Sequence, residues 1–144
     1  MELIVVIAII GILSVLVFSS LSETKNNQVL KSAVEDVVSL LNKARSQTLA
    51  SLNLTTYGVH FESNKIVLFS GTTYNTDDAS NEVVDVSSPA TISNISLTDG
   101  ATEFYFNRLS GVPSKTGNIK ISISSNANLV KTITISSTGG VSVN

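Results

Sequence analysis

Few residues of this 144-residue chain carry side chains that could do chemistry. There is no cysteine, which excludes disulfides, thiolate metal sites and cysteine nucleophiles, and the single histidine, His60, excludes a multi-histidine metal site. His60 stands between Val59 and Phe61 in an alternating stretch, without the serine and aspartate of a catalytic triad around it. No glycine-rich phosphate loop, paired catalytic carboxylates or nucleophile elbow is present. We therefore expect no enzymatic activity and no cofactor.

Acidic residues gather in one polar stretch, where Asp77, Asp78 and Glu82 could offer carboxylate oxygens to a calcium ion. Their spacing does not fit an EF-hand, and the residues between Gly71 and Asn81 are typical of a solvent-exposed loop. We expect a polar loop there and no metal site.

The most unusual charge is Glu2, because an apolar run follows it directly. The run LIVVIAIIGILSVLVF covers residues 3–18, and its extension to Leu21 gives 19 residues, close to the ~20 that cross a bilayer as a helix. A carboxylate drawn to the bilayer centre costs up to ~2.5 to 3.5 kcal/mol. Glu2 therefore either stays at the interface, where the helix dipole favours it, or pairs with a cation. That cation would come from a neighbouring chain, since no lysine or arginine precedes Lys25.

The composition indicates one small domain with an apolar appendage. The length suffices for one packed core and is too short for two domains of full size. Hydrophobic residues make up 42% of the chain and are concentrated at its N-terminus, whereas charged residues make up only 14%. With 9 Lys and Arg against 11 Asp and Glu the net charge is -2, which argues against a nucleic-acid partner.

A second helical pattern continues from the apolar run, with no proline or glycine between Gly11 and Gly58. Apolar positions recur every three or four residues, as in a helix with one buried stripe, at Leu30, Val34, Val37, Leu41 and Leu52. We predict one continuous helix of about 50 residues. Residues 1–22 would form its membrane or filament-core part, and residues 23–53 its amphipathic half. The alternative is two helices with a hinge between Ser19 and Gln28.

Past Asn53 the apolar period changes to two, which predicts strands. The expected strands cover 57–61, 65–69, 82–86, 91–97, 102–106, 119–123, the surroundings of 133–135, and 141–143. A turn is expected at Asn126 to Asn128, and Gly139-Gly140 gives a last tight turn. Because no later helix offers crossovers, all pairing should be antiparallel. Residues 54–144 would form a β head packed on the second half of the helix, an α+β fold.

The stretch ELIVVIAIIGIL at Glu2–Leu13 closely resembles the N-terminal signature of type IV pilins and type II secretion pseudopilins, the class III signal-peptide proteins. The resemblance implies that a prepilin peptidase removes a short basic leader before a Phe and that the new N-terminus is methylated. It also implies that Glu2 pairs with the N-terminal amine of an adjacent subunit. By this alignment the leader and the first three mature residues lie outside the sequence. Gly11 is taken as a further assembly position. Gly11, Ser14, Ser19 and Ser20 are all weak helix formers, so they permit the helix to melt inside a filament without indicating at which of them it does so.

The C-terminal region adds a softer resemblance. The order Phe104-x-Phe106, Gly111, Pro113, Gly117-x-Ile119, Ile133-x-Ile135 and Gly139-Gly140-Val141 looks like the C-terminal sheet of minor-type pseudopilins and their pilus counterparts. Two features depart from many pilins: there is no proline near Ser19 and no disulfide in the head.

The resemblance implies a structural subunit that polymerises through its N-terminal helix into a type IV pilus-like surface filament of the kind used in adhesion or secretion. Its partners would be copies of itself, the prepilin peptidase, and the pilus or secretion assembly machinery. It would reside in the cytoplasmic membrane as a single-pass subunit and then in an extracellular filament. The alternatives are a minor pilin, a pseudopilin of a type II secretion system, or a monomeric membrane-anchored binding module.

Overall fold

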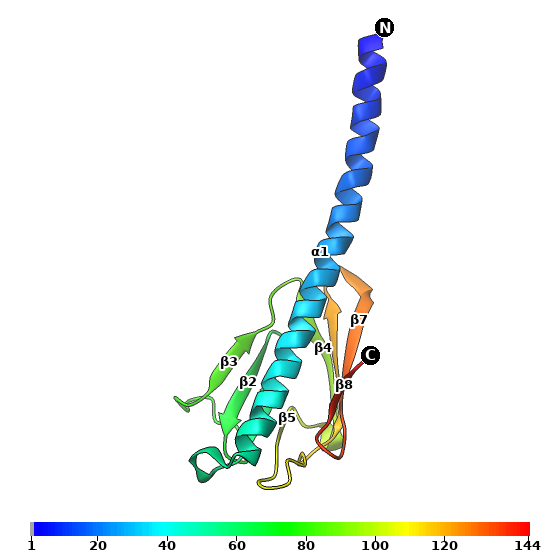
Figure 1. Ribbon diagram of the computed structural model, residues 1–144. Helices are drawn as coiled ribbons and strands as arrows, with labels where there is room; N and C mark the ends of the chain where they lie inside the picture. Colours follow the sequence, from blue (N-terminus) through cyan, green and yellow to red (C-terminus); the bar gives the residue numbers. More distant parts are fainter. Residues whose placement is uncertain (1) are drawn as a thin grey trace.

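A single helix, α1 (Glu2–Leu49), runs through 48 residues without interruption, so the chain has no hinge between Ser19 and Gln28. At 1.5 Å per residue α1 is about 72 Å long. The computed structural model describes the backbone of residues 2–144 and the side chains of residues 3–14 and 23–144. In Figure 1 the N-terminal half of α1 projects away from the head, and its C-terminal half lies against the strands.

The end of α1 differs from the prediction. The helix stops at Leu49, four residues before the expected boundary, and a short 3-10 helix, η1 (Leu52–Leu54), follows. Ser51 and Asn53 have φ of 50° and 52°, a left-handed backbone that cannot continue an α-helix. Leu52 is consequently turned off the helix and is 45% exposed, so its expected place on the packing stripe is wrong.

Within residues 2–144, eight strands form two antiparallel four-stranded sheets. The first has the order β3-β2-β1-β5, with β1 (Tyr57–Phe61), β2 (Lys65–Ser70), β3 (Glu82–Asp85) and β5 (Glu103–Tyr105). The second has the order β4-β6-β7-β8, with β4 (Ala90–Leu97), β6 (Gly117–Ile123), β7 (Asn126–Ile135) and β8 (Val141–Val143). A 3-10 turn, η2 (Thr98–Gly100), follows β4.

The sheets confirm the strands predicted from the alternation of apolar residues, but one predicted turn lies at a different place. Val59 pairs with Leu68 across the β1–β2 hairpin, and Ile119 pairs with Ile133 between β6 and β7. The turn expected at residues 126–128 lies instead at residues 124–125, because β7 already begins at Asn126. The result is the predicted α+β fold, with a long helix on antiparallel β structure.

The core lies between α1 and both sheets. Leu30, Val34, Val37 and Leu41 are buried in it and carry the helix side of the contact. The strand side consists of alternate apolar residues, among them Val59, Phe61, Ile66, Phe104, Phe106, Ile119, Ile121, Ile133 and Ile135. Among the side chains described, no residue before Leu30 belongs to the buried core.

A chain truncated to begin at Lys25 should therefore be soluble and folded, because it keeps every buried residue of the described core and loses the apolar run at residues 3–21. Its near-ultraviolet circular dichroism should show fixed aromatic packing, and size-exclusion chromatography should show a monomer at low concentration. Aggregation, or a molten spectrum with helical signal but no fixed tertiary packing, would contradict this division of the chain.

Candidate assembly surfaces

Residues 3–14, whose side chains the structure describes, form an apolar stretch of α1 that is exposed at every position. Its large apolar side chains are all more than half exposed: Leu3, Ile4, Val5, Val6, Ile7, Ile9, Ile10, Ile12 and Leu13. At Gly11 an added Cβ would meet no atom within 4 Å, so this glycine is not required by packing within the chain. Continuous apolar surface on this scale marks a contact with lipid or with other apolar helices.

The expected membrane segment and Glu2 are only partly covered by the structure. Glu2 is the first helical residue, and its side chain, like those of residues 15–22, lies outside the described set. Across the part of the chain that the structure describes, no helix reaches the combined length and hydropathy of a membrane span.

Polar contacts fix the second half of α1 to the head. Arg45 donates from Nε to the carbonyl oxygen of Gly111 at 3.2 Å and from Nη2 to that of Thr138 at 3.1 Å, which joins two separate loops to the helix. Thr48 is fully buried, and its Oγ1 accepts a hydrogen bond from the backbone N–H of Tyr57 at 2.9 Å. These contacts, together with the core, give the projecting helix one defined direction relative to the head.

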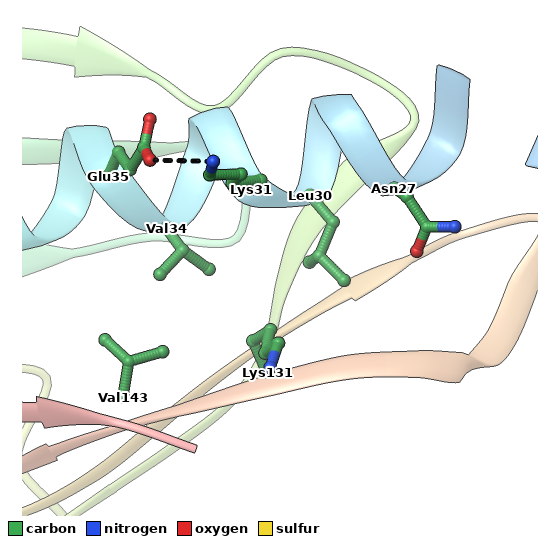
Figure 2. A pocket seen from close by; sticks show the side chains of 7 residues that line it. All are labelled: Asn27, Leu30, Lys31, Val34, Glu35, Lys131 and Val143. Carbon is green, nitrogen blue, oxygen red and sulfur yellow. Dashed lines mark ion pairs between the residues drawn. The ribbon is translucent and has the colours of Figure 1, made fainter. Parts of the chain in front are cut away.

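A cavity of about 360 Å³ lies where α1 leaves the head, between the helix and strands β7 and β8. We call it the shoulder cavity; Figure 2 shows its lining, which is Asn27, Leu30, Lys31, Val34, Glu35, Lys131 and Val143. Val34 projects from α1 toward Val143 of β8, and Leu30 projects toward Lys131 of β7, so the lining between the helix and the strands is mostly apolar. Lys31 and Glu35 form an exposed ion pair at its edge, 3.8 Å apart.

A second apolar surface lies at the opposite end of the head, where α1 ends. It consists of five exposed residues, one at the end of α1 and four in two nearby loops, which we call the distal cap: Leu49, Leu52, Leu54, Leu109 and Val112. The loops are in contact, because Arg108 donates from Nη1 to the carbonyl oxygen of Leu54 at 2.8 Å and Gly111 approaches the Leu49 side chain. The sequence analysis missed this surface; leucines inside polar loops are the signal that could have revealed it.

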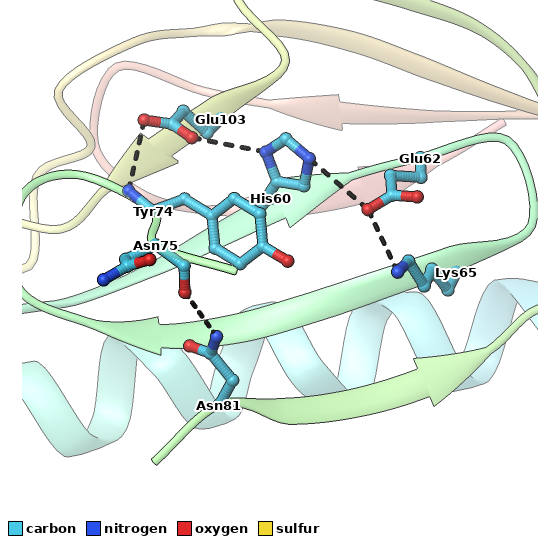
Figure 3. A network of polar contacts seen from close by, with 7 residues as sticks. All are labelled: His60, Glu62, Lys65, Tyr74, Asn75, Asn81 and Glu103. Carbon is cyan, nitrogen blue, oxygen red and sulfur yellow. Dashed lines mark hydrogen bonds and ion pairs between the residues drawn. The ribbon is translucent and has the colours of Figure 1, made fainter. Parts of the chain in front are cut away.

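His60 lies on the face of β1 opposite Val59 and Phe61, as the alternation predicts, inside a polar network (Figure 3). Its Nδ1 is 3.2 Å from Oε2 of Glu103, and its Nε2 is 3.8 Å from Oε1 of Glu62. The imidazole also stacks on the ring of Tyr74, with centroids 4.2 Å apart. This network joins β1, β5 and the loop at residues 71–81.

Glu82 and Asp78 of the acidic stretch have different partners in the structure. Glu82 pairs with Lys43 of α1 at 2.5 Å. Hydrogen bonds from the backbone N–H and the hydroxyl of Ser80 lower the pKa of Asp78 below its ordinary value. Among the described residues no group of three or more metal-ligating side chains comes together.

Comparison with known proteins identifies relatives of this architecture. Residues 33–139 match the family model described as type II transport protein GspH. Two crystal structures of the type IV minor pilin FimU from Pseudomonas aeruginosa share the fold. One has a TM-score of 0.62 at 15% identity, covering 84% of this chain and 91% of that one; the other has a TM-score of 0.58 at 14% identity, covering 79% and 91%. No curated protein sequence matches the chain.

Proposed function

The chain belongs to the type II transport protein GspH family, and from this membership we propose that it is a minor pilin-like subunit of a type II secretion pseudopilus or a type IV pilus. Proteins of this family are structural subunits and not enzymes. The match to GspH and the likeness to a minor pilin support this assignment over the major filament subunit that the N-terminal signature first suggests.

One observation carries the proposal. The first half of α1 exposes apolar side chains along its whole described length, and the second half is firmly attached to a folded head. A helix of this kind lies in a bilayer before assembly and against other apolar helices afterwards, because both remove its surface from water. We propose a single-pass subunit in the cytoplasmic membrane that is processed by a prepilin peptidase, methylated at its new N-terminus, and transferred into an extracellular filament.

The proposed minor role is tested by stoichiometry. In cells that make the corresponding pseudopilus or pilus, sheared filaments should contain this chain in small amounts relative to the main subunit, measured by quantitative mass spectrometry. Deleting the chain should reduce secretion or filament number, and expressing it again should restore them. A chain that makes up most of the filament would be a major subunit, and a chain absent from every filament fraction would contradict both assignments.

Filaments that contain this chain should resist salt and dissolve in detergent. The surface that holds them together is apolar, whereas salt at about 1 M screens charges beyond about 3 Å. Sedimentation after treatment with about 1 M NaCl should leave the chain in the pellet, and a mild detergent should release it. Release by salt alone would mean that charges of the head hold the assembly.

A further inference from the structure

We propose that an extended segment of a different filament subunit adds to the free edge of β8 as a further strand. Its apolar side chains would enter the shoulder cavity, and a carboxylate of the same segment would meet Lys131. The inference rests on the proposed function, since it describes how this chain meets a neighbouring subunit. It assigns one occupant to the shoulder cavity and to the strand edge that borders it.

The free edge of β8 offers backbone groups for such a strand. β8 is the last strand in the order β4-β6-β7-β8. Thr132 donates to the carbonyl oxygen of Asn144 at 2.8 Å, and Asn144 donates back at 2.9 Å, so this pair is a hydrogen-bonded position of the β7–β8 ladder. In an antiparallel ladder the next position points its backbone groups the other way. The N–H and C=O of Val143 and Val141 therefore face the free edge, and within residues 2–144 neither has a backbone hydrogen bond outside this ladder.

The other sheet edges are protected against a further strand. On β5, the N–H of Ser114 donates to the carbonyl oxygen of Tyr105 at 2.8 Å, which covers the outer side. On β4, the N–H of Ile92 donates to the carbonyl oxygen of Ser63 at 2.9 Å, and β3 begins and ends with an acidic residue. β8 is Val-Ser-Val, without a charge or a proline. An edge that lacks these protections is suited to accept an added strand.

The shoulder cavity lies on the side to which apolar side chains of the added strand would point. Val141 packs against the core and Val143 lines the cavity, so both face α1. Residues opposite them on an added strand would point to this same side. The cavity has a volume of about 360 Å³ and is lined by Leu30 and Val34 of α1. Apolar side chains that enter it leave water, which favours a segment with apolar residues at alternate positions.

The charges around the cavity favour an acidic segment. Lys31 and Glu35 already pair with each other at 3.8 Å. Lys131 of β7 lies beside the cavity in Figure 2 and has no ion pair with any residue that the structure describes. The lining therefore has one positive charge in excess. A carboxylate beside Lys131 would fix the register of the added strand and would disfavour basic segments.

A second copy of β8 does not fit this edge in a filament. Two identical edges that pair with each other are related by a two-fold axis. Because α1 runs along the strands in Figure 1, such a pair would point its two helices in opposite directions. Helices that enter a filament from one membrane point the same way. The added strand therefore comes from another part of a neighbouring subunit, and for a minor chain that neighbour is a different protein.

Hydrogen exchange of the full-length chain tests strand addition directly. In the chain solubilised in detergent, the amides of Val141 and Val143 should exchange fast, whereas those of Ser142 and Asn144 face β7 and should exchange slowly. In sheared filaments the exchange of Val141 and Val143 should slow at least about ten-fold. The amide of Thr73, on an exposed loop, should not change. Fragmentation of the C-terminal peptide by mass spectrometry resolves these amides.

The exchange experiment separates the contact from the proposed function. Fast exchange of Val141 and Val143 in filaments that contain the chain overturns the proposal and leaves the proposed function standing. Absence of the chain from every filament fraction refutes the proposed function instead.

Val143→Pro removes the N–H that faces the free edge and leaves the ladder with β7 intact. Incorporation of this variant into filaments should fall at least about five-fold, with a melting temperature within about 3 °C of the wild type. Val143→Ala shortens the same side chain and keeps the N–H, so its loss of incorporation should be clearly smaller. Equal losses would mean that side-chain packing alone makes the contact, and normal incorporation of Val143→Pro would exclude the strand; both results overturn the proposal. If proline lowers the melting temperature further, the exchange of the wild-type amides decides.

Lys131→Glu tests the charge of the partner and should lower incorporation at least about three-fold. Lys120→Glu makes the same change on the opposite face of the same sheet, at an exposed position, and should leave incorporation unchanged. Equal effects of the two variants overturn the acidic partner. Because the chain has no cysteine, two differently tagged copies with Ser142→Cys can be treated with a short bis-maleimide. A mixed dimer would make a second copy the occupant of the edge and would overturn the proposal.

Discussion

Val37→Asp should unfold the head. Val37 is 0% exposed and lies in the core between α1 and the sheets. A carboxylate at this position has no partner and no water, so burying it costs several kcal/mol, and a domain of this size has a total stability of about 5 to 15 kcal/mol. The chain beginning at Lys25 should lose its cooperative urea transition and its near-ultraviolet circular dichroism.

Two further variants identify the cause. Ser39→Asp adds the same charge two residues along α1 at an exposed position, and its stability should change by less than about 0.5 kcal/mol. Val37→Ala removes packing without adding charge and should cost about 2 kcal/mol of stability.

The stability of Val37→Asp should depend on pH with a definite sign. Burial raises the pKa of the introduced carboxyl in the folded state, so the folded state binds more protons than the unfolded state. Val37→Asp should therefore regain stability as the pH falls, and recovery at high pH instead would mean that the buried charge is not the cause.

The sequence predicts α1 well because the pattern that indicates a helix involves residues only three or four positions apart. The spacing of Leu30, Val34, Val37 and Leu41 identifies one face of α1, and all four are buried. The same spacing fails at Leu52, because a periodic pattern does not detect the left-handed turn that ends the helix. The turn has neither glycine nor proline to indicate it; of its left-handed residues Ser51 and Asn53, only asparagine accepts that conformation more readily than most residues.

The strands were predictable one at a time, whereas their association was not. Alternation locates β1 and β2 and the hairpin between them, but the pairing of β1 with β5 joins residues more than 40 positions apart. The network around His60 depends on that pairing, since Glu103 reaches the imidazole from β5. The shoulder cavity likewise combines α1 with β7 and β8, and the division of the strands into two sheets is a property of the packed structure. Such contacts leave no local pattern in a single sequence.

Glu2 is the residue on which the assembly model depends. It stands at the start of a helix whose next twelve residues carry no charge, and its side chain lies outside the described set. In a bundle of apolar helices a carboxylate is tolerated only beside a cation, because little water is left to solvate it. We propose that the N-terminal amine of a neighbouring subunit is that cation, and that the pairing sets the register in which an incoming subunit leaves the membrane.

Glu2→Ala should abolish incorporation into filaments while leaving the chain expressed, membrane-associated and folded. The head does not depend on Glu2, since the described core begins at Leu30. Glu23→Ala removes the same charge from an exposed position on the same helix and should leave incorporation unchanged. Immunoblots of sheared filaments and membranes measure incorporation, with the variant expressed in the absence of a wild-type copy.

If the chain is instead a monomeric membrane anchor, Glu2→Ala should cause no loss of function. Losing a charge at the end of an apolar helix eases insertion into lipid and removes nothing that an anchor needs. If the Glu2→Ala chain is incorporated normally, the apolar surface of α1, and not a buried ion pair, selects the position of the subunit in the filament.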